Sequence, residues 1–390
     1  MNVTRLNGAR LPPALHRLLF VLLLAVAGGA VAQELFRADP PIVCADCDDW
    51  NAPQEPFRVF GNTYYVGTAG LSAALIASDA GHILIDGGLP QSAPLIEANI
   101  RALGFRLRDV RLIVNSHEHY DHAGGIASLQ RASGAKVAAS AAGARALMQG
   151  HPVPEDPQYQ SGLNERFPPV TTVETISDGA ALTVGSLAVT AHFTPGHTPG
   201  ATSWSWRSCE GTRCVDIVYV DSLNPVSDDG FRFTGDSTRP SIEELFRRSI
   251  ARVEQLPCDV VLPPHPGFVN LREKAARLKK QQPTQNPFVQ ANACRSYAAI
   301  VRKRLDQRVG EERKLPIRRT AAMRGDEDAA TIAFGHIARC KRGAPHQPHV
   351  IMRVGRGVAQ PGSAPALGAG GRWFESSRPD HFPSSAVTAG

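Results

Sequence analysis

Beyond its first 32 residues, the 390-residue chain lacks any apolar run near the length of about 20 residues that a membrane-spanning helix needs. Its central part also lacks an excess of positive charge. Residues 1–32 carry three bases and no acids, and residues 311–390 carry twelve bases and seven acids, so the formal net charge of +6 leaves −2 for residues 33–310. This distribution provides no basic surface for nucleic acid. We therefore expect neither a nucleic-acid partner nor a membrane-spanning helix after residue 32.

The N-terminal segment 1–32 has the organisation of a signal peptide. Three arginines flank the apolar run of residues 18–27 on its N-terminal side, and Ala30-Val31-Ala32 is a small-residue cleavage site. The alternative, an uncleaved membrane anchor, is disfavoured because the run is short. We predict export to the periplasm, cleavage after Ala32, and no stable membrane association after cleavage.

Export to an oxidising compartment allows cysteines to pair. Cys209 and Cys214 flank a predicted hairpin turn, where a local bridge can form. Cys258 and Cys294 lie on either side of a predicted helix, and a bridge between them would attach the C-terminal helix to a sheet.

The other three cysteines are less informative. Cys44 and Cys47 form a C-A-D-C motif that permits either a local disulfide or two reduced thiols. A zinc ribbon would require a second Cys pair at matching spacing, and the sequence has none. Cys340 is left without a partner, in a C-terminal segment of different composition.

That segment, residues 309–390, is rich in Arg, Gly, Ala and Pro and has weak hydrophobic periodicity. Codons for Trp373-Phe374-Glu375-Ser376 can spell a sequence that resembles the T-arm of a tRNA gene, so we interpret the segment as read-through past the proper stop. The alternative is a genuine disordered extension. We expect no fold and no function from it, and we place the folded domain at residues 33–308.

The segment from Phe57 to Leu305 alternates short β-branched or aromatic runs with helical patterns, which is typical of an α/β protein. Both halves run from strands to a helix and a histidine-bearing loop. This order suggests an internal pseudo-repeat and fits a four-layer αββα sandwich with sheets inside and helices outside. Helices are predicted at residues 92–103, 125–132, 141–148, 241–255 and 287–305.

The strongest functional signal is the loop at residues 116–125 (SHEHYDHAGG), which directly follows an apolar strand. His117 and His119 are two residues apart, so in an extended loop their side chains point the same way and can share a metal. Asp121 and His122 lie at the turn into a helix and point to an adjacent spot. The loop therefore predicts two neighbouring metal sites with N and O ligands, which zinc favours.

Further ligands must come from other parts of the chain. His197 (in T-P-G-H-T-P-G) and His265 (in P-P-H-P-G) each follow a predicted strand in a turn fixed by Pro and Gly. Taken alone, each is as compatible with a structural histidine as with a ligand. With the loop they complete two sets, which are His117/His119/His197 and Asp121/His122/His265. Three protein ligands per ion leave room for water, as in catalytic zinc sites.

The H-x-H-x-D-H motif followed by G-H-T-P-G resembles the metallo-β-lactamase superfamily over residues 57–305. Within it, the chain is most similar to the third subclass of class B β-lactamases, because of the full motif, residues 219–223 (YVDSL), residues 264–267 (PHPG) and the Cys258/Cys294 pair. Ser222 stands where the other large subclass has a Cys ligand. Asp86, in an I-D-G-G run, resembles a strand-end Asp that supports the metal loop from behind.

The resemblance implies two Zn²⁺ per chain and hydrolysis of the amide bond of small-molecule β-lactams, which confers antibiotic resistance. A metal-bound hydroxide, oriented by Asp121, would attack the lactam carbonyl. Ser222 and Asn224 would bind the substrate carboxylate, although members of the subclass often carry Ser at the second position. Trp50 either lines the substrate cleft or packs under the N-terminal segment.

Two other functions remain open. A glyoxalase-II-like thioesterase or a lactonase shares the metal loop and G-H-T-P-G, and bridges its metals with an Asp that Asp221 could supply. A non-catalytic periplasmic zinc-binding protein is the other alternative, although open coordination positions argue against it. The sequence does not rank penicillins, cephalosporins and carbapenems, and it leaves the oligomeric state open.

Overall fold

The apolar residues at 74–85 and 110–114 alternate between the two faces of their strands, which indicates a sheet covered on both sides. The computed structural model describes residues 36–162, 165–280 and 285–314, all of which belong to one unit, Met1–Pro316. These strands form the centre of a seven-stranded sheet, antiparallel from β1 to β4 and parallel from β4 to β7. In spatial order its strands are β1 (Phe57–Phe60), β2 (Thr63–Tyr65), β3 (Ala74–Ser78), β4 (Gly81–Ile85), β5 (Val110–Val114), β6 (Lys136–Ala139) and β7 (Glu174–Thr175).

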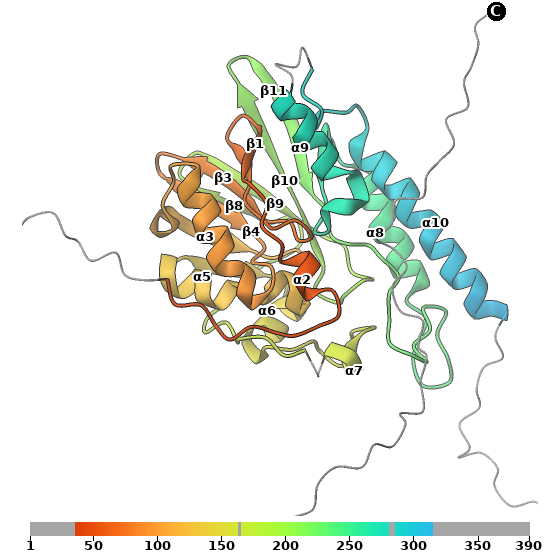
Figure 1. Ribbon diagram of the computed structural model, residues 1–390. Coiled ribbons are helices and arrows are strands. Elements are labelled where there is room, and N and C mark those ends of the chain that lie inside the picture. The colour runs from red at the N-terminus through yellow and green to blue at the C-terminus, as the bar shows by residue number, and fades with distance from the viewer. Residues whose placement is uncertain (1–35, 163–164, 281–284, 315–390) are drawn as a thin grey trace, which may run out of the picture. The chain divides into compact units, whose positions relative to one another are not determined.

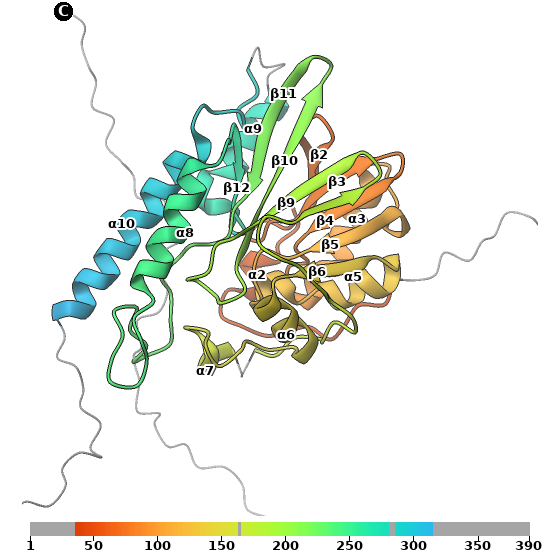
Figure 2. The same ribbon diagram turned by 180° about the vertical axis from the view of Figure 1, so that it is seen from behind.

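A second sheet has five strands, of which all neighbours are antiparallel except the parallel pair β11 and β12. In spatial order they are β12 (Val260–Leu262), β11 (Arg213–Tyr219), β10 (Thr202–Glu210), β9 (Leu187–Phe193) and β8 (Ala181–Val184). The long β10–β11 hairpin projects beyond the rest of the sheet (Figure 2).

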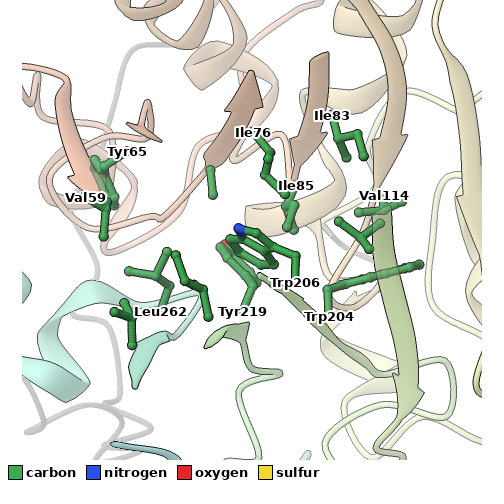
Figure 3. Close-up of a cluster of buried hydrophobic side chains, with 14 of the residues drawn as sticks. Val59, Tyr65, Ile76, Ile83, Ile85, Val114, Trp204, Trp206, Tyr219 and Leu262 are labelled. Carbon is green, nitrogen blue, oxygen red and sulfur yellow. The ribbon is translucent and has the colours of Figure 1, made fainter. Parts of the chain in front are cut away.

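The two sheets pack face to face through a shared apolar layer (Figure 3). Ile76, Ile85 and Val114 of the first sheet meet Trp204 and Trp206 of the second, and all five side chains are buried. The indole N–H of Trp206 donates to the Thr63 hydroxyl at 2.9 Å, and that of Trp204 donates to the Asn115 carbonyl at 3.0 Å. The buried indoles therefore satisfy their polar atoms while they join the sheets.

Helices cover the two outer faces, as Figures 1 and 2 show. Helices α3 (Ala93–Ala102), α5 (Ile126–Ser133) and α6 (Ala141–Gln149) pack on the first sheet. Helices α8 (Glu243–Gln255) and α10 (Ala293–Lys314) pack on the second. The remaining helices are α2 (Cys47–Trp50), α4 (Tyr120–Ala123), α7 (Tyr159–Gly162), α9 (Leu271–Lys280) and the 3₁₀ turns η1 (Pro90–Ser92), η2 (Leu107–Asp109) and η3 (Pro266–Val269). The predicted αββα sandwich is confirmed.

Helix α10 differs from its predicted bounds of 287–305 at both ends. It begins later because Asn286 Oδ1 accepts a hydrogen bond from the Phe288 amide and the Gln290 amide donates to the Asp259 carbonyl, which fixes a turn before the helix. It continues to Lys314 because the buried Glu312 side chain binds the Phe233 amide. The first six residues of the predicted tail are therefore helical, whereas residues 315–390 lie outside the described residues. Helix α9 has no counterpart among the predicted helices.

Three disulfides join Cys44 to Cys47, Cys209 to Cys214, and Cys258 to Cys294. The sequence allowed either a disulfide or two thiols at Cys44 and Cys47, and the structure has the disulfide. Cys340 and the predicted signal peptide at 1–32 lie outside the described residues. Within the described part of the chain, no helix has both the length and the hydropathy of a bilayer span.

Candidate metal centre

The histidine loop leaves the carboxyl end of β5, at the edge of the first sheet that faces the ends of β9 and β11. His117 and His119 lie in the extended segment after the strand, and Asp121 and His122 lie in the first turn of α4. All four side chains are buried, with relative exposures between 0 and 7%. Polar side chains buried to this extent need hydrogen-bond or metal partners. The imidazoles of the group do not supply enough of these partners to one another.

Asp86 holds the loop from behind. It adopts a left-handed backbone conformation (φ 63°) at the end of β4, and its buried carboxylate accepts hydrogen bonds from Asn115 Nδ2, Ser116 N, Ser116 Oγ and Tyr219 OH at 2.6–3.0 Å. Burial raises the pKa of Asp86 to about 6, although these donors and His122 oppose the shift. The next residue, Gly87, donates its amide to the His122 carbonyl at 2.9 Å. The I-D-G-G run therefore fixes both ends of the histidine loop.

His197 comes from the turn after β9 and completes the first group. His117, His119 and His197 each offer a ring nitrogen, and these three atoms lie within 4.8 Å of one another. The ring centroids are 4.7–5.1 Å apart. Burial, followed by the neighbouring imidazoles, lowers the pKa of His117 and His197 well below the usual value, so both rings stay neutral. A neutral imidazole is the form that binds a metal ion.

The second group is tighter. Asp121 Oδ2 lies 3.1 Å from His122 Nε2 and 3.3 Å from His265 Nε2, and the two ring nitrogens are 3.2 Å apart. A tetrahedral zinc with ligands at about 2.0–2.1 Å holds its ligand atoms roughly 3.3 Å apart. The three atoms therefore have the spacing of one face of a zinc tetrahedron. Burial alone would raise the pKa of Asp121, but His122 and His265 lower it well below its usual range, so the carboxylate is charged.

Each ring of the first group is held by its other nitrogen. His117 Nδ1 lies 3.2 Å from Asp221 Oδ1, and His197 Nδ1 donates to the Asn224 carbonyl at 2.8 Å. His119 Nε2 lies 3.2 Å from Asp156, whose carboxylate, against the effect of burial, raises the pKa of His119 to about 9, so a metal ion that binds this ring has to displace a proton. These contacts leave His117 Nε2, His197 Nε2 and His119 Nδ1 for a metal. Such outer partners orient metal-binding histidines in general.

Glu118 was missed by sequence reasoning because its partners lie 80 residues away. Its buried carboxylate accepts hydrogen bonds from Thr198 Oγ1 at 2.8 Å and from the Gly200 amide at 2.9 Å. Burial and the nearby Asp156 raise the pKa of Glu118 to about 7. Glu118 thereby ties the histidine loop to the turn that carries His197. The charged residue between two ligands of the motif was its only sequence signal.

The predicted substrate residues follow β11, and Asn224 contacts the first group through its carbonyl, which binds His197 Nδ1. Ser222 follows β11, and its hydroxyl is buried without a hydrogen-bond partner among the described residues. Asn224 is half-buried, and its side-chain oxygen faces Arg304. The ring of Trp50 lies 5.3 Å from that of His265 and 6.5 Å from that of Tyr120, so the N-terminal segment does reach the metal-binding residues.

Solved structures support this assignment. The chain is 49% identical to the Rm3 metallo-β-lactamase, with a TM-score of 0.67, over 70% of this chain and all of that one. It is 48% identical to MEM-A1, a subclass B3 metallo-β-lactamase isolated from a soil metagenome library, with a TM-score of 0.65, over 68% of this chain and 99% of that one. SMB-1, solved with bound 2-mercaptoethanesulfonate, is 43% identical with a TM-score of 0.64, over 68% of this chain and 99% of its own.

A curated relative points to a second activity in the same superfamily. A hydroxyacylglutathione hydrolase of Anaeromyxobacter dehalogenans (strain 2CP-C) is 31% identical over 193 residues, which is 50% of this chain. The match spans only 59% of that protein's length. The family model of the metallo-β-lactamase superfamily matches residues 67–265, which contain all six predicted ligands. With its αββα sandwich and converging His and Asp side chains, the chain belongs to the metallo-β-lactamase superfamily.

Proposed function

We propose that this chain is a zinc-dependent β-lactamase that hydrolyses the lactam amide bond with two zinc ions. The observation that carries the proposal is the spacing of Asp121, His122 and His265 beside the group of three histidines, of which His117 also lies close to Asp121 and His122. Six ligands in two adjacent sets suit two ions, and each set leaves coordination positions for water and substrate. The solved neighbours at 43–49% identity are metallo-β-lactamases, and the chain covers almost their full length.

Bound zinc would supply a water whose pKa falls to about 7 and a Lewis acid for the carbonyl oxygen. The chain's own residues set the geometry. Asp121 is charged and accepts hydrogen bonds at the border of the two groups, where it can orient a water. Ser222 offers a hydroxyl that has no hydrogen-bond partner in the described part of the chain, and such a hydroxyl can donate to a substrate carboxylate. The ring of Trp50 lies beside that of His265, at 5.3 Å, where it can contact a ligand bound at the second group.

The position of Asp221 separates this proposal from a thioesterase that uses an Asp to bridge its metals. Asp221 Oδ1 lies 3.2 Å from His117 Nδ1, and Oδ2 accepts the Leu223 amide at 3.1 Å. Oδ1 has no hydrogen-bond partner among the described residues, and it lies near the His117 ring nitrogen that faces away from the proposed metal position. This placement suits a residue that orients His117 better than one that bridges two metals.

The first prediction tests the activity itself. The zinc-loaded protein should hydrolyse a carbapenem, followed by its absorbance, and a chelator should lower the rate by on the order of a hundredfold or more because the nucleophile depends on the metal. Added Zn²⁺ should restore the rate, and Mg²⁺ should not. A glutathione thioester assayed in parallel is the control. Fast thioester cleavage without β-lactam turnover would replace the proposal with a thioesterase, and full zinc binding without any hydrolysis would leave a zinc-binding protein.

We also propose that the mature protein works in the periplasm. The signal-like segment at 1–32 and the three disulfides support an oxidising compartment. Cell fractionation of a producing bacterium, followed by N-terminal sequencing, tests this location, and intact protein in the cytoplasm would contradict it.

A further inference from the structure

Arg304 of helix α10 stands beside the metal centre without a carboxylate partner among the described residues. It is half-buried, and its Nη1 donates to Asn224 Oδ1 at 3.4 Å. Its guanidinium carbon lies 4.4 Å from the centre of the Phe268 ring, which stacks on its charged plane. Burial lowers the pKa of Arg304, as expected for a cation that is partly removed from water without an anion beside it.

Both residues that contact Arg304 also contact a residue of the proposed metal centre. Asn224 accepts a hydrogen bond from His197 through its carbonyl, at 2.8 Å. Phe268 lies three residues after His265, and their ring centroids are 6.4 Å apart. The guanidinium is therefore one side chain away from each of the two ligand groups, on the side of the site that α10 covers.

The same helix face also positions Ser222. Tyr297, two helical turns before Arg304, donates its hydroxyl to the Ser222 carbonyl at 2.6 Å and to the Asp221 carbonyl at 3.1 Å. Residues seven apart lie on one face of a helix. Helix α10 thus brings to the same strand end a fixed hydroxyl donor and a cation that has no carboxylate partner within the described ranges.

Arg308, one helical turn after Arg304, serves as a comparison because its contacts are those of an arginine with a structural role. Its guanidinium pairs with Glu312 at 2.8 Å and donates to Ser227 Oγ and the Phe231 carbonyl. Arg304 differs, because its contacts with described residues are one side-chain amide and one aromatic ring, which engage only one of its five N–H donors.

We propose that Arg304 binds the anionic group, in the first instance a carboxylate, of a ligand whose other end reaches the metal centre. Asn224 and Phe268 hold the guanidinium in place, and Ser222, which Tyr297 of the same helix face fixes through its carbonyl, supplies a hydroxyl as a second donor. A planar guanidinium binds a carboxylate through two parallel hydrogen bonds, which sets orientation as well as affinity. The inference deepens the proposed function, because it assigns the group that recognises the carboxylate of a β-lactam.

The test uses two small thiols of similar size that differ in charge. A thiolate binds zinc, so mercaptoacetate and 2-mercaptoethanol both anchor at the metal centre, but only the former carries a carboxylate. Their dissociation constants are measured by calorimetry on the zinc-loaded, full-length protein and on the Arg304→Met variant, which keeps an apolar stem against Phe268. For each protein the ratio of the two dissociation constants is taken. Comparison of this ratio between the two proteins removes the intrinsic difference in zinc affinity between the two thiol groups.

We expect the unsubstituted protein to prefer mercaptoacetate and Arg304→Met to lose about tenfold of that preference, the effect of one charge-assisted contact. Arg304→Lys should retain part of it. Lys303→Met, which removes an exposed cation from the same helix, is the matched control and should leave the ratio unchanged. Equal weakening of both thiols would assign Arg304 to the support of Asn224 instead and overturn the proposal, and so would an unchanged ratio.

Failure of the inference is distinguishable from failure of the proposed function. If the loaded protein hydrolyses no β-lactam but the thiol ratio falls in Arg304→Met, the lactamase proposal fails and the anion site stands. If hydrolysis occurs and the ratio does not depend on Arg304, the anion site fails alone. A protein that binds no zinc loses both.

Discussion

At the scale of single residues, the histidines of the first group are positioned by partners on their outer nitrogens. Asp221, Asp156 and the Asn224 carbonyl each take one ring nitrogen. Glu118 accepts no hydrogen bond from an imidazole. It joins the histidine loop to the turn that carries His197. Loss of such supporting contacts typically weakens metal binding by about 10–100-fold without removing a ligand. The chemistry of the site therefore depends on buried acids outside the six proposed ligands.

Glu118 provides a test at this scale. Glu118→Ala should weaken zinc binding by about tenfold and lower the free energy of unfolding by roughly 2–4 kcal/mol, because Thr198 Oγ1 and the Gly200 amide are left buried without an acceptor. Zinc affinity is measured by competition with a chromophoric chelator, and stability by denaturant unfolding of the metal-free protein.

Glu118→Gln is the matched variant, since its amide oxygen still accepts one of the two hydrogen bonds. It should fall between the alanine variant and the unsubstituted protein in both measurements. Wild-type zinc affinity in Glu118→Ala, together with wild-type stability, would show that the turn carrying His197 is held by its prolines and backbone alone.

At the scale of elements, the sequence predicts that the ligands lie at the ends of strands. It predicts only in part the bounds of the helices that support these strand ends. Strands β9 and β12 lie where the sequence predicts a strand before His197 and before His265, since each is a short apolar run that ends near Pro and Gly. Helix α10 does not, because its start depends on a turn at Asn286 and its end on a contact between residue 312 and residue 233. Such contacts join distant segments and leave no local pattern.

Glu312 links α10 to the loop before α8. Its carboxylate accepts hydrogen bonds from Phe233 N, Thr234 N, Thr234 Oγ1 and Arg308 Nε at 2.8–3.0 Å. Glu312→Ala should lower the free energy of unfolding by roughly 2–4 kcal/mol, since a buried acceptor of several donors is removed. Denaturant unfolding at neutral pH measures the change.

The pH dependence of this contribution has a definite sign. Burial would raise the pKa of Glu312, but the donors lower it below the usual value. A carboxyl with a lowered folded pKa adds stability above the unfolded pKa and loses it as the pH falls through the folded pKa. The stability difference between wild type and Glu312→Ala should therefore be largest at neutral pH and shrink in acid. Chain termination supplies a control, because a chain that ends at Lys314 should behave as the full chain. One that ends at Arg308 should lose more stability than Glu312→Ala, since it also removes the buried Val309.

At the scale of the whole molecule, the site forms where two sheets meet. The histidine loop belongs to the first sheet, and His197, Ser222 and His265 follow strands of the second. The indole N–H of Trp204 donates to the Asn115 carbonyl, directly before that loop, and so fixes one sheet against the other at the site. The sequence predicts this convergence because the ligands are motif residues with chemistry of their own. It does not predict Asp156, Glu118 or Arg304, whose roles depend on which segments the packing brings together.

The disulfides test how far the two sheets' outer layers depend on covalent links. Cys258 and Cys294 are 36 residues apart, and Cys209 and Cys214 only five. If a bridge acts mainly by restricting the unfolded chain, the longer loop contributes about 4 kcal/mol and the shorter about 2 kcal/mol. The Cys258→Ala/Cys294→Ala variant should therefore lose more unfolding free energy than Cys209→Ala/Cys214→Ala, when both are measured by denaturant unfolding without reductant.

The Cys258–Cys294 bridge also attaches α10, which carries Tyr297 and Arg304, to the start of β12, so its removal should weaken mercaptoacetate binding as well. The reverse order of stabilities would show that the β10–β11 hairpin is held by its bridge and that helix packing alone retains α10.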